Sequence, residues 1–144
     1  MKRLLFVTVA AFLAASPAHA KTAALKWMDG PPGLPSGSKF AVVSGDPGKE
    51  GTFVIQAKLP ADYAVPPHWH PTNEVVKVLS GKLHYGMSDK LDMAKAKTLT
   101  AGHTVTMKAK MNHWVHAPAP ATIQVSGKGP FQITYVDPKD DPRK

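Results

Sequence analysis

The amino-acid sequence predicts a single all-β domain, built as a sandwich or a closed barrel. Its apolar residues gather in short segments rich in valine, isoleucine, threonine and aromatic residues, which favour strands. The 14 prolines and 11 glycines fall mostly between these segments, where turns are expected. Helical periodicity is almost absent, and a chain of 144 residues suits one domain.

The strands are predicted in chain order from these segments and from the turn residues that separate them, such as Ser80-Gly81. The expected strands cover residues 40–43, 52–59, 65–70, 74–79, 82–87, 104–108, 113–116, 122–126 and 131–136. Residues 89–97 are rich in alanine and lysine and predict a short turn or helix. An irregular segment, 21–39, precedes the domain of residues 40–136, and a polar tail, 137–144, follows it.

Residues 1–20 have the pattern of a secretory signal peptide. Lys2 and Arg3 precede an apolar run over 4–15, and Ala18-His19-Ala20 supplies the small-x-small cleavage site. A membrane anchor is the alternative, but the run is shorter than the about 20 residues that span a bilayer. The mature chain is therefore expected to be periplasmic or secreted, with no membrane attachment after cleavage.

The composition excludes several classes of function. The chain contains no cysteine, which excludes a thiol nucleophile, a zinc–thiolate site and disulfides. The formal net charge is +8, but the basic residues are scattered singly rather than in runs. Such scattering does not predict a nucleic-acid interface. The expected partner is a small-molecule ligand or substrate, and no nucleic acid.

One group of residues predicts a metal site. His68 and His70 lie two apart in an extended, proline-flanked segment, so both imidazoles project from the same face of a strand. Glu74 follows a short turn and can return over this pair. His113 begins a later strand that closure of the barrel can place opposite the pair. Imidazole nitrogen and carboxylate oxygen together are typical ligands of divalent transition metals.

At these residues the sequence resembles the cupin superfamily. The first cupin motif has the form G-x5-H-x-H-x3-E-x6-G, and His68, His70, Glu74 and Gly81 reproduce it. Only its opening glycine differs, since Asp62 stands there.

The second cupin motif, G-x5-P-x-G-x2-H-x3-N, is matched more weakly. Gly102 and His113 keep its spacing, whereas Lys108 and Lys110 replace the proline and the glycine. Ala117 stands in place of the asparagine.

The resemblance implies a small, exported, single-domain bacterial cupin with an RmlC-like jelly-roll barrel over residues 40–136. It further implies one divalent metal ion, held by His68, His70, Glu74 and His113. The ion could be iron, manganese, zinc, nickel or copper. Jelly rolls of this size often pair, so a homodimer is possible, with Trp69, Val75 and Leu79 on the shared face.

Two functions are compatible with such a site. Four protein ligands leave one or two open positions on a six-coordinate ion, which suits a metalloenzyme acting on a small organic substrate. An oxidoreductase of the dioxygenase type is expected first. The alternative is a non-catalytic cupin that binds a metal or small ligand, or that serves as a sensor.

The other histidines of the predicted mature chain are not expected to bind this metal. His84 alternates with Leu83 and Tyr85 and is predicted to face outward. His103 lies in a turn after Gly102. His116 is three residues beyond His113 and should project from the opposite face of the strand.

Overall fold

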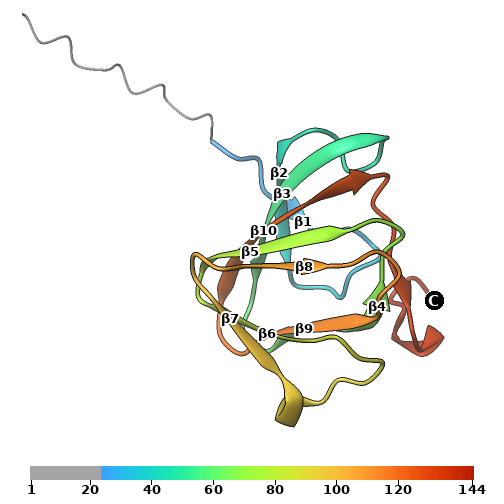
Figure 1. The fold of residues 1–144 in the computed structure, drawn as a ribbon. Helices are drawn as coiled ribbons and strands as arrows, with labels where there is room; N and C mark the ends of the chain where they lie inside the picture. Colours follow the sequence, from blue (N-terminus) through green and yellow to red (C-terminus); the bar gives the residue numbers. More distant parts are fainter. Residues whose placement is uncertain (1–23) are drawn as a thin grey trace, which may run out of the picture.

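The computed structural model describes residues 24–144, which form two antiparallel β-sheets that face each other (Figure 1). The predicted signal peptide, residues 1–20, lies outside the described residues. The first sheet has the strand order β1 (Met28–Asp29), β2 (Lys39–Ser44), β3 (Gly51–Leu59), β10 (Ala121–Gly129), β5 (Glu74–Ser80) and β8 (Thr104–Met107). The second has the order β11 (Thr134–Tyr135), β4 (Tyr63–Trp69), β9 (His113–Ala117), β6 (Lys82–Gly86) and β7 (Lys97–Thr100).

Strands that are distant in the sequence pair at the centre of each sheet, as a jelly roll requires. In the first sheet, β10 lies between β3 and β5, and its pairing with β3 runs from Gly129 opposite Gly51 to Ala121 opposite Leu59. In the second sheet, β9 lies between β4 and β6. The prediction of an all-β jelly roll is thus confirmed, and residues 24–144 contain no α-helix.

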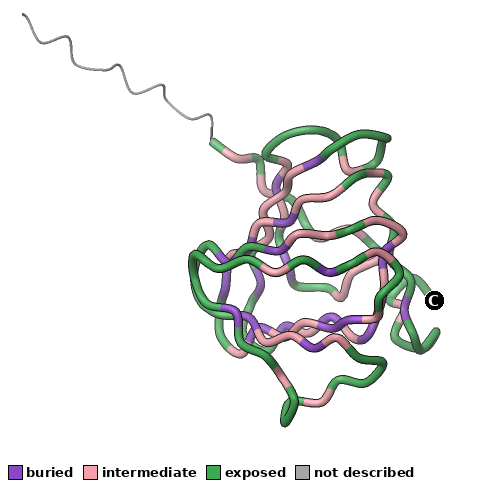
Figure 2. Tube along the Cα trace, in the orientation of Figure 1, coloured by how far each residue is buried: buried purple, intermediate pink, exposed green. Residues whose placement is uncertain are grey.

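Alternation of side chains along the strands builds the core between the sheets. In β10 the buried residues Ala121, Ile123 and Val125 alternate with residues of intermediate exposure. In β5, Val76 and Val78 are buried in the same way. Figure 2 shows buried residues along the strands and exposed ones in most connecting loops. Because successive side chains of a strand point to opposite faces, one face of each sheet closes the core.

A tryptophan on the outer face of the second sheet is also buried. Trp114, in β9, is 1% exposed and packs over Gly86 of β6, and its indole nitrogen donates a hydrogen bond to Ser88 Oγ at 3.1 Å. A Cβ atom at Gly86 would lie 2.4 Å from the Trp114 ring, so glycine is required there. This packing fixes Trp114 near the start of β9, and with it His113, the residue directly before Trp114.

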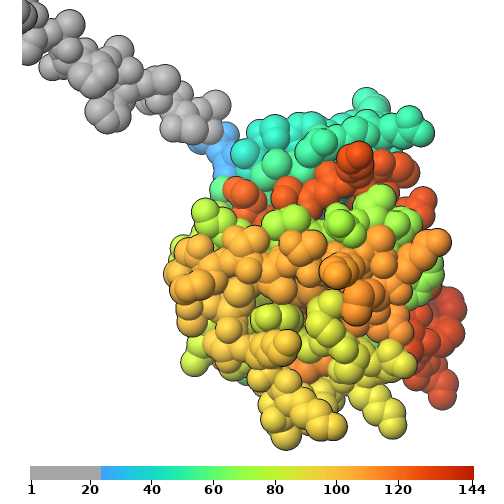
Figure 3. All heavy atoms as spheres, in the orientation of Figure 1, coloured from blue at the N-terminus to red at the C-terminus, as the bar shows by residue number. Residues whose placement is uncertain are grey.

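The structure departs from the predicted elements at the edges of the sheets. Residues 89–97, predicted as a short turn or helix, do contain a single-turn 3-10 helix, Met93–Lys95, whose first turn is capped by the Asp92 carboxylate. Strand β7 was not predicted, because Leu99 is its one buried residue. The 3-10 helix and β7 lie in the yellow part of the surface in Figure 3, and the helix projects at its lower edge.

The two ends of the described chain also contain short elements. Strand β1 lies within the segment predicted to be irregular, and the last predicted strand, 131–136, is reduced to the two residues of β11. In the tail, Arg143 pairs with Asp141 and donates a hydrogen bond from Nη2 to the Ile133 carbonyl at 3.2 Å. Among residues 24–144, no helix has the length and apolar character needed to cross a membrane.

Candidate metal centre

The predicted ligands come from both sheets. His68 lies near the end of β4, and His70 directly follows that strand. His113 is the first residue of β9 and stands opposite His68 in the antiparallel pairing of these strands. Glu74 is the first residue of β5, in the other sheet. The register of β4 shifts between Val65 and His68, at the two prolines, so both histidines turn into the space between the sheets.

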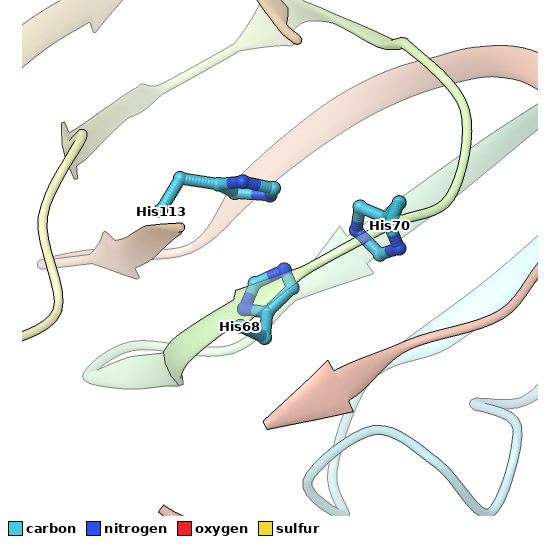
Figure 4. A group of neighbouring side chains, drawn as sticks. All are labelled: His68, His70 and His113. Atoms are coloured by element: carbon cyan, nitrogen blue, oxygen red, sulfur yellow. The ribbon is translucent and has the colours of Figure 1, made fainter. Parts of the chain in front are cut away.

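The three imidazole rings converge on one point (Figure 4). The ring centroids are 5.0 Å apart for His68 and His70, 4.3 Å for His68 and His113, and 5.3 Å for His70 and His113. One ring nitrogen from each histidine lies within 4.8 Å of the others, and all three residues are buried. Two nitrogens bound to one ion at about 2.1 Å each are roughly 3 Å apart, so small side-chain rotations suffice to bind it.

Backbone carbonyls set the tautomer of each ring. All three Nδ1 atoms contact a carbonyl oxygen, which only accepts hydrogen bonds, so Nδ1 carries the hydrogen. These contacts join His68 to Pro66 at 2.6 Å, His70 to Gln132 at 2.6 Å and His113 to Met111 at 3.0 Å. Each Nε2 lone pair is therefore free. The Nε2 atoms of His70 and His113 are buried and have no hydrogen-bond partner in the described part of the chain. Buried polar atoms of this kind are costly unless a ligand satisfies them.

Glu74 brings a negative charge to the same place. Its two carboxylate oxygens lie 3.6 Å from His70 Nε2 and 3.6 Å from His113 Nε2, and its side chain is 14% exposed. Burial alone would raise the pKa of this carboxyl, but its contact with His113 and the charges of the neighbouring histidines outweigh burial and lower it.

His68 favours the neutral state that a metal ligand requires. Burial, and after it the charge of His113, lowers the pKa of His68 to about 3. Three imidazoles and one carboxylate are donors that fit a divalent transition metal, and the carboxylate would offset part of its charge. The structure therefore holds a buried three-histidine candidate metal site. The assignment of all four residues as ligands stays a prediction.

An apolar cavity of about 280 Å³ opens beside the cluster, between the two sheets. His68, His70 and Glu74 contribute to its wall. Phe131 also lines it and packs against His70, with their ring centroids 5.0 Å apart. A ligand in this cavity would lie next to any ion held by the histidines.

The structure adds Tyr63 and Ser38 to the residues around this cavity. The sequence contains a signal for Tyr63, which alternates with Val65 along β4 and so shares its face. It contains none for Ser38, which lies outside any periodic segment. Gln56 and Gln124, by contrast, do not line the cavity, because their neighbours Ile55, Ala57, Ile123 and Val125 point into it.

The remaining histidines lie away from the cluster, as predicted. His84 and His116 stand opposite each other on β6 and β9, with stacked rings 6.1 Å apart. His116 Nε2 lies 3.8 Å from the Asp62 carboxylate. His103 is exposed, and its Nδ1 lies 3.0 Å from Thr100 Oγ1.

Fold and site together define a jelly-roll protein with a buried histidine cluster beside an apolar cavity. The family model for the cupin domain matches residues 49–126, more than half of the chain, so this protein belongs to the cupin family. The resemblance drawn from the sequence motifs is confirmed. A comparison with curated proteins gave no match.

Solved structures share the fold at low sequence identity. A polyketide cyclase, RemF from Streptomyces resistomycificus, superposes with a TM-score of 0.68 at 15% identity over 87% of this chain and 89% of its own. A proposed acetylacetone dioxygenase from Methylibium petroleiphilum gives 0.65 at 18% identity, over 90% and 87%. An RmlC-like cupin from Shewanella frigidimarina gives 0.59 at 16% identity, over 78% and 91%. At these identities the likeness establishes the fold alone.

Proposed function

We propose that this protein is an exported, metal-dependent oxidoreductase of the dioxygenase type that acts on a small organic substrate. The observation that carries the proposal is the pair of buried, unpartnered Nε2 atoms of His70 and His113, which stand beside Glu74 and the apolar cavity. Such atoms are satisfied by a metal ion, and the adjoining cavity offers space for a substrate next to that ion.

When bound at these residues, a redox-active divalent metal would supply Lewis acidity and electron exchange with oxygen. The protein supplies position and charge. The backbone carbonyls that accept from Nδ1 hold the His68, His70 and His113 rings in one tautomer and one orientation. The Glu74 carboxylate would partly neutralise the positive charge of a bound ion. The apolar walls keep bulk water from the substrate and so strengthen the electrostatic interactions at the site.

The size of the cavity and the fold support a small substrate. A volume of about 280 Å³ lies just below the usual range for small-molecule sites. The fold is shared with a proposed acetylacetone dioxygenase over 90% of this chain, which favours oxygen chemistry on a small carbonyl compound. Fold likeness alone does not fix a reaction, so the proposal depends on the site.

The test is to load the protein with Fe(II) without air and to add nitric oxide, a surrogate for oxygen. An accessible iron with an open position gives a characteristic spectrum, and oxygen uptake should follow with small phenols, diketones or thiols. Glu74→Gln should change the spectrum and reduce uptake, because a charged donor is lost. Glu50→Gln is the matched control, since Glu50 is exposed and is the only other glutamate in the chain. No spectrum and no uptake in the loaded protein would contradict the proposal.

One observation favours the alternative, a cupin that binds its ligand without reaction. Apart from the candidate ligands, the described cavity wall offers only the hydroxyls of Tyr63 and Ser38 as groups that exchange protons. Burial raises the pKa of Tyr63, which makes it a poor base at neutral pH. If the iron, manganese and copper forms turn over no compound in a broad screen, while one small molecule binds unchanged, the binding function replaces the enzyme.

A further inference from the structure

The residues that line the cavity are spread along the strands, with the candidate metal centre near one end of this spread. Tyr63 opens strand β4 and His68 comes five residues later, and both line the cavity. At about 3.3 Å per residue the strand carries these two positions roughly 15 Å apart. In the facing sheet, Glu74 lies beside Gly127 at one end of β10, and Leu59 lies beside Ala121 at the other. A ligand in the cavity therefore has a metal end and a distal end.

Between its two ends the cavity wall is apolar. It is formed from both sheets by Ile55, Val65, Val76, Val115, Ile123 and Val125. Among the lining residues within 24–144, Glu74 is the only acidic one, and none is a lysine or an arginine. A negatively charged group away from the metal would lose its hydration without gaining a cationic partner, which strongly disfavours binding. The wall thus selects an uncharged, apolar body.

The distal end carries two hydroxyl groups. Tyr63 donates a hydrogen bond to the Pro35 carbonyl at 2.7 Å, and its oxygen also lies 3.2 Å from Ser38 Oγ. The single hydrogen of Tyr63 is engaged by the shorter contact. Ser38 is 3% exposed, and with the Tyr63 hydrogen on the Pro35 carbonyl its hydroxyl donates to the Tyr63 oxygen. Rotation of this hydroxyl turns the same hydrogen to an acceptor in the cavity.

We propose that the ligand of this cavity is an uncharged, elongated molecule that places oxygen donors at the histidine cluster and a hydrogen-bond acceptor, such as a ketone or ether oxygen, at Ser38. A cavity of about 280 Å³ suits a small ligand. Carboxylates whose charge lies at the distal end are excluded. The proposal rests on the proposed function of the site, and it adds the class of ligand.

The test uses the zinc-loaded protein, which is redox-inert, and three catechols of matched size measured by titration calorimetry. In each, the two hydroxyl oxygens are expected to bind the metal, and the substituent at the opposite end of the ring is acetyl, isopropyl or carboxylate. The acetyl compound should bind best. The isopropyl compound should bind about 3- to 10-fold more weakly, since one hydrogen bond is lost. The carboxylate should bind at least about 100-fold more weakly, because its charge is unpaired.

Two variants locate the effect. Ser38→Ala should make the acetyl and isopropyl compounds bind equally while leaving the isopropyl affinity unchanged, and Ser36→Ala, at an exposed serine nearby, should change neither. Phe40→Lys places a cation at a half-buried lining position, where the ammonium can reach toward solvent, and should recover carboxylate binding to within about tenfold of the ketone.

Equal affinity for the carboxylate and the acetyl compound would overturn the proposal. So would a loss of affinity in Ser38→Ala that is the same for all three compounds. Failure of all three to bind to protein that holds zinc would overturn it as well. Because zinc supports no redox turnover, these results are separate from the oxidoreductase function. If the three catechols bind in the expected order but the iron form takes up no oxygen, the oxidoreductase function is contradicted and the ligand class is not.

Discussion

At the scale of single residues, the ligand set makes a prediction about metal-dependent stability. A metal that binds only the folded protein at 100 times its dissociation constant raises the free energy of unfolding by about 2.7 kcal/mol. His113→Ala should abolish the resulting rise in Tm, because it removes a buried ring nitrogen that faces Glu74. His84→Ala is the control, since His84 lies on the outer face, and should keep the rise. Thermal scans with and without Zn(II) or Mn(II) measure this, and an equal rise in His113→Ala would contradict the assignment.

The low pKa of His68 predicts acid sensitivity of the metal-free protein. This pKa is lowered from 6.5 to about 3 in the folded state. Between these values the unfolded chain binds a proton that the folded protein does not. The free energy of unfolding should therefore be insensitive to this group above pH 6.5 and fall as the pH drops toward 3, by about 1.4 kcal/mol per pH unit. The lowered pKa of Glu74 adds to the loss below its ordinary value of 4.5.

Urea unfolding of chelator-treated protein across this pH range measures the slope. His68→Ala should flatten the slope between pH 6.5 and 4.5, whereas His103→Ala, at an exposed turn residue, should leave it unchanged. A slope that persists undiminished in His68→Ala would show that another group titrates in this range.

The candidate metal residues were predictable from the sequence because their spacing carries the geometry. Two histidines at i and i+2 share a strand face, and the motif supplies Glu74 and His113. The partners that orient the rings were not predictable. The Gln132 carbonyl reaches His70 across 62 residues of sequence, and such a contact depends on the whole fold. Ser38 was missed for the same reason, since an irregular segment has no period that reveals which side chains face inward.

At the scale of elements, the packing of β6 against β9 makes a prediction about stability. Gly86→Ala would place a Cβ atom 2.4 Å from the Trp114 ring, which is buried and hydrogen bonded to Ser88. Overpacking of this kind costs about 1–3 kcal/mol in the free energy of unfolding. Gly48→Ala is the control, because its nearest atom would be the flexible Asp46 carboxylate at 3.3 Å. Chemical denaturation compares them, and equal stability would contradict the packing argument.

Central strands were predicted well, whereas edge strands were not. Strand β10 alternates buried and half-buried residues from Ala121 to Ser126, which a sequence pattern reveals. Strand β7 has one buried residue, Leu99, and β1 has none, so neither carries a pattern. Their positions follow from pairing with β6 and β2, and pairing is a property of the sheet.

At the scale of the whole molecule, the proposed export predicts a defined mature end. Cleavage after Ala20 should leave a protein that begins at Lys21 and is recovered outside the cytoplasm. Intact mass and N-terminal sequencing of material from the native compartment measure this. Changing Ala18 and Ala20 to bulky residues should retain the precursor, because the small side chains that define the cleavage site are lost. A membrane-bound form that keeps residues 1–20 would contradict the prediction.

The hydrogen bond between His70 Nδ1 and the Gln132 carbonyl has a consequence for the order in which a metal ion and an organic ligand bind. His70 Nδ1 is hydrogen bonded to the Gln132 carbonyl. The residue before Gln132, Phe131, lines the cavity and packs on the His70 ring. An ion on the opposite nitrogen would restrain the ring further and, through it, that wall. Loading should therefore be sequential, with the ion first and the organic molecule second. Molecules too short to touch the ion should still bind more tightly to the metal-loaded protein. Their site is then already ordered, so less conformational entropy is lost when they bind.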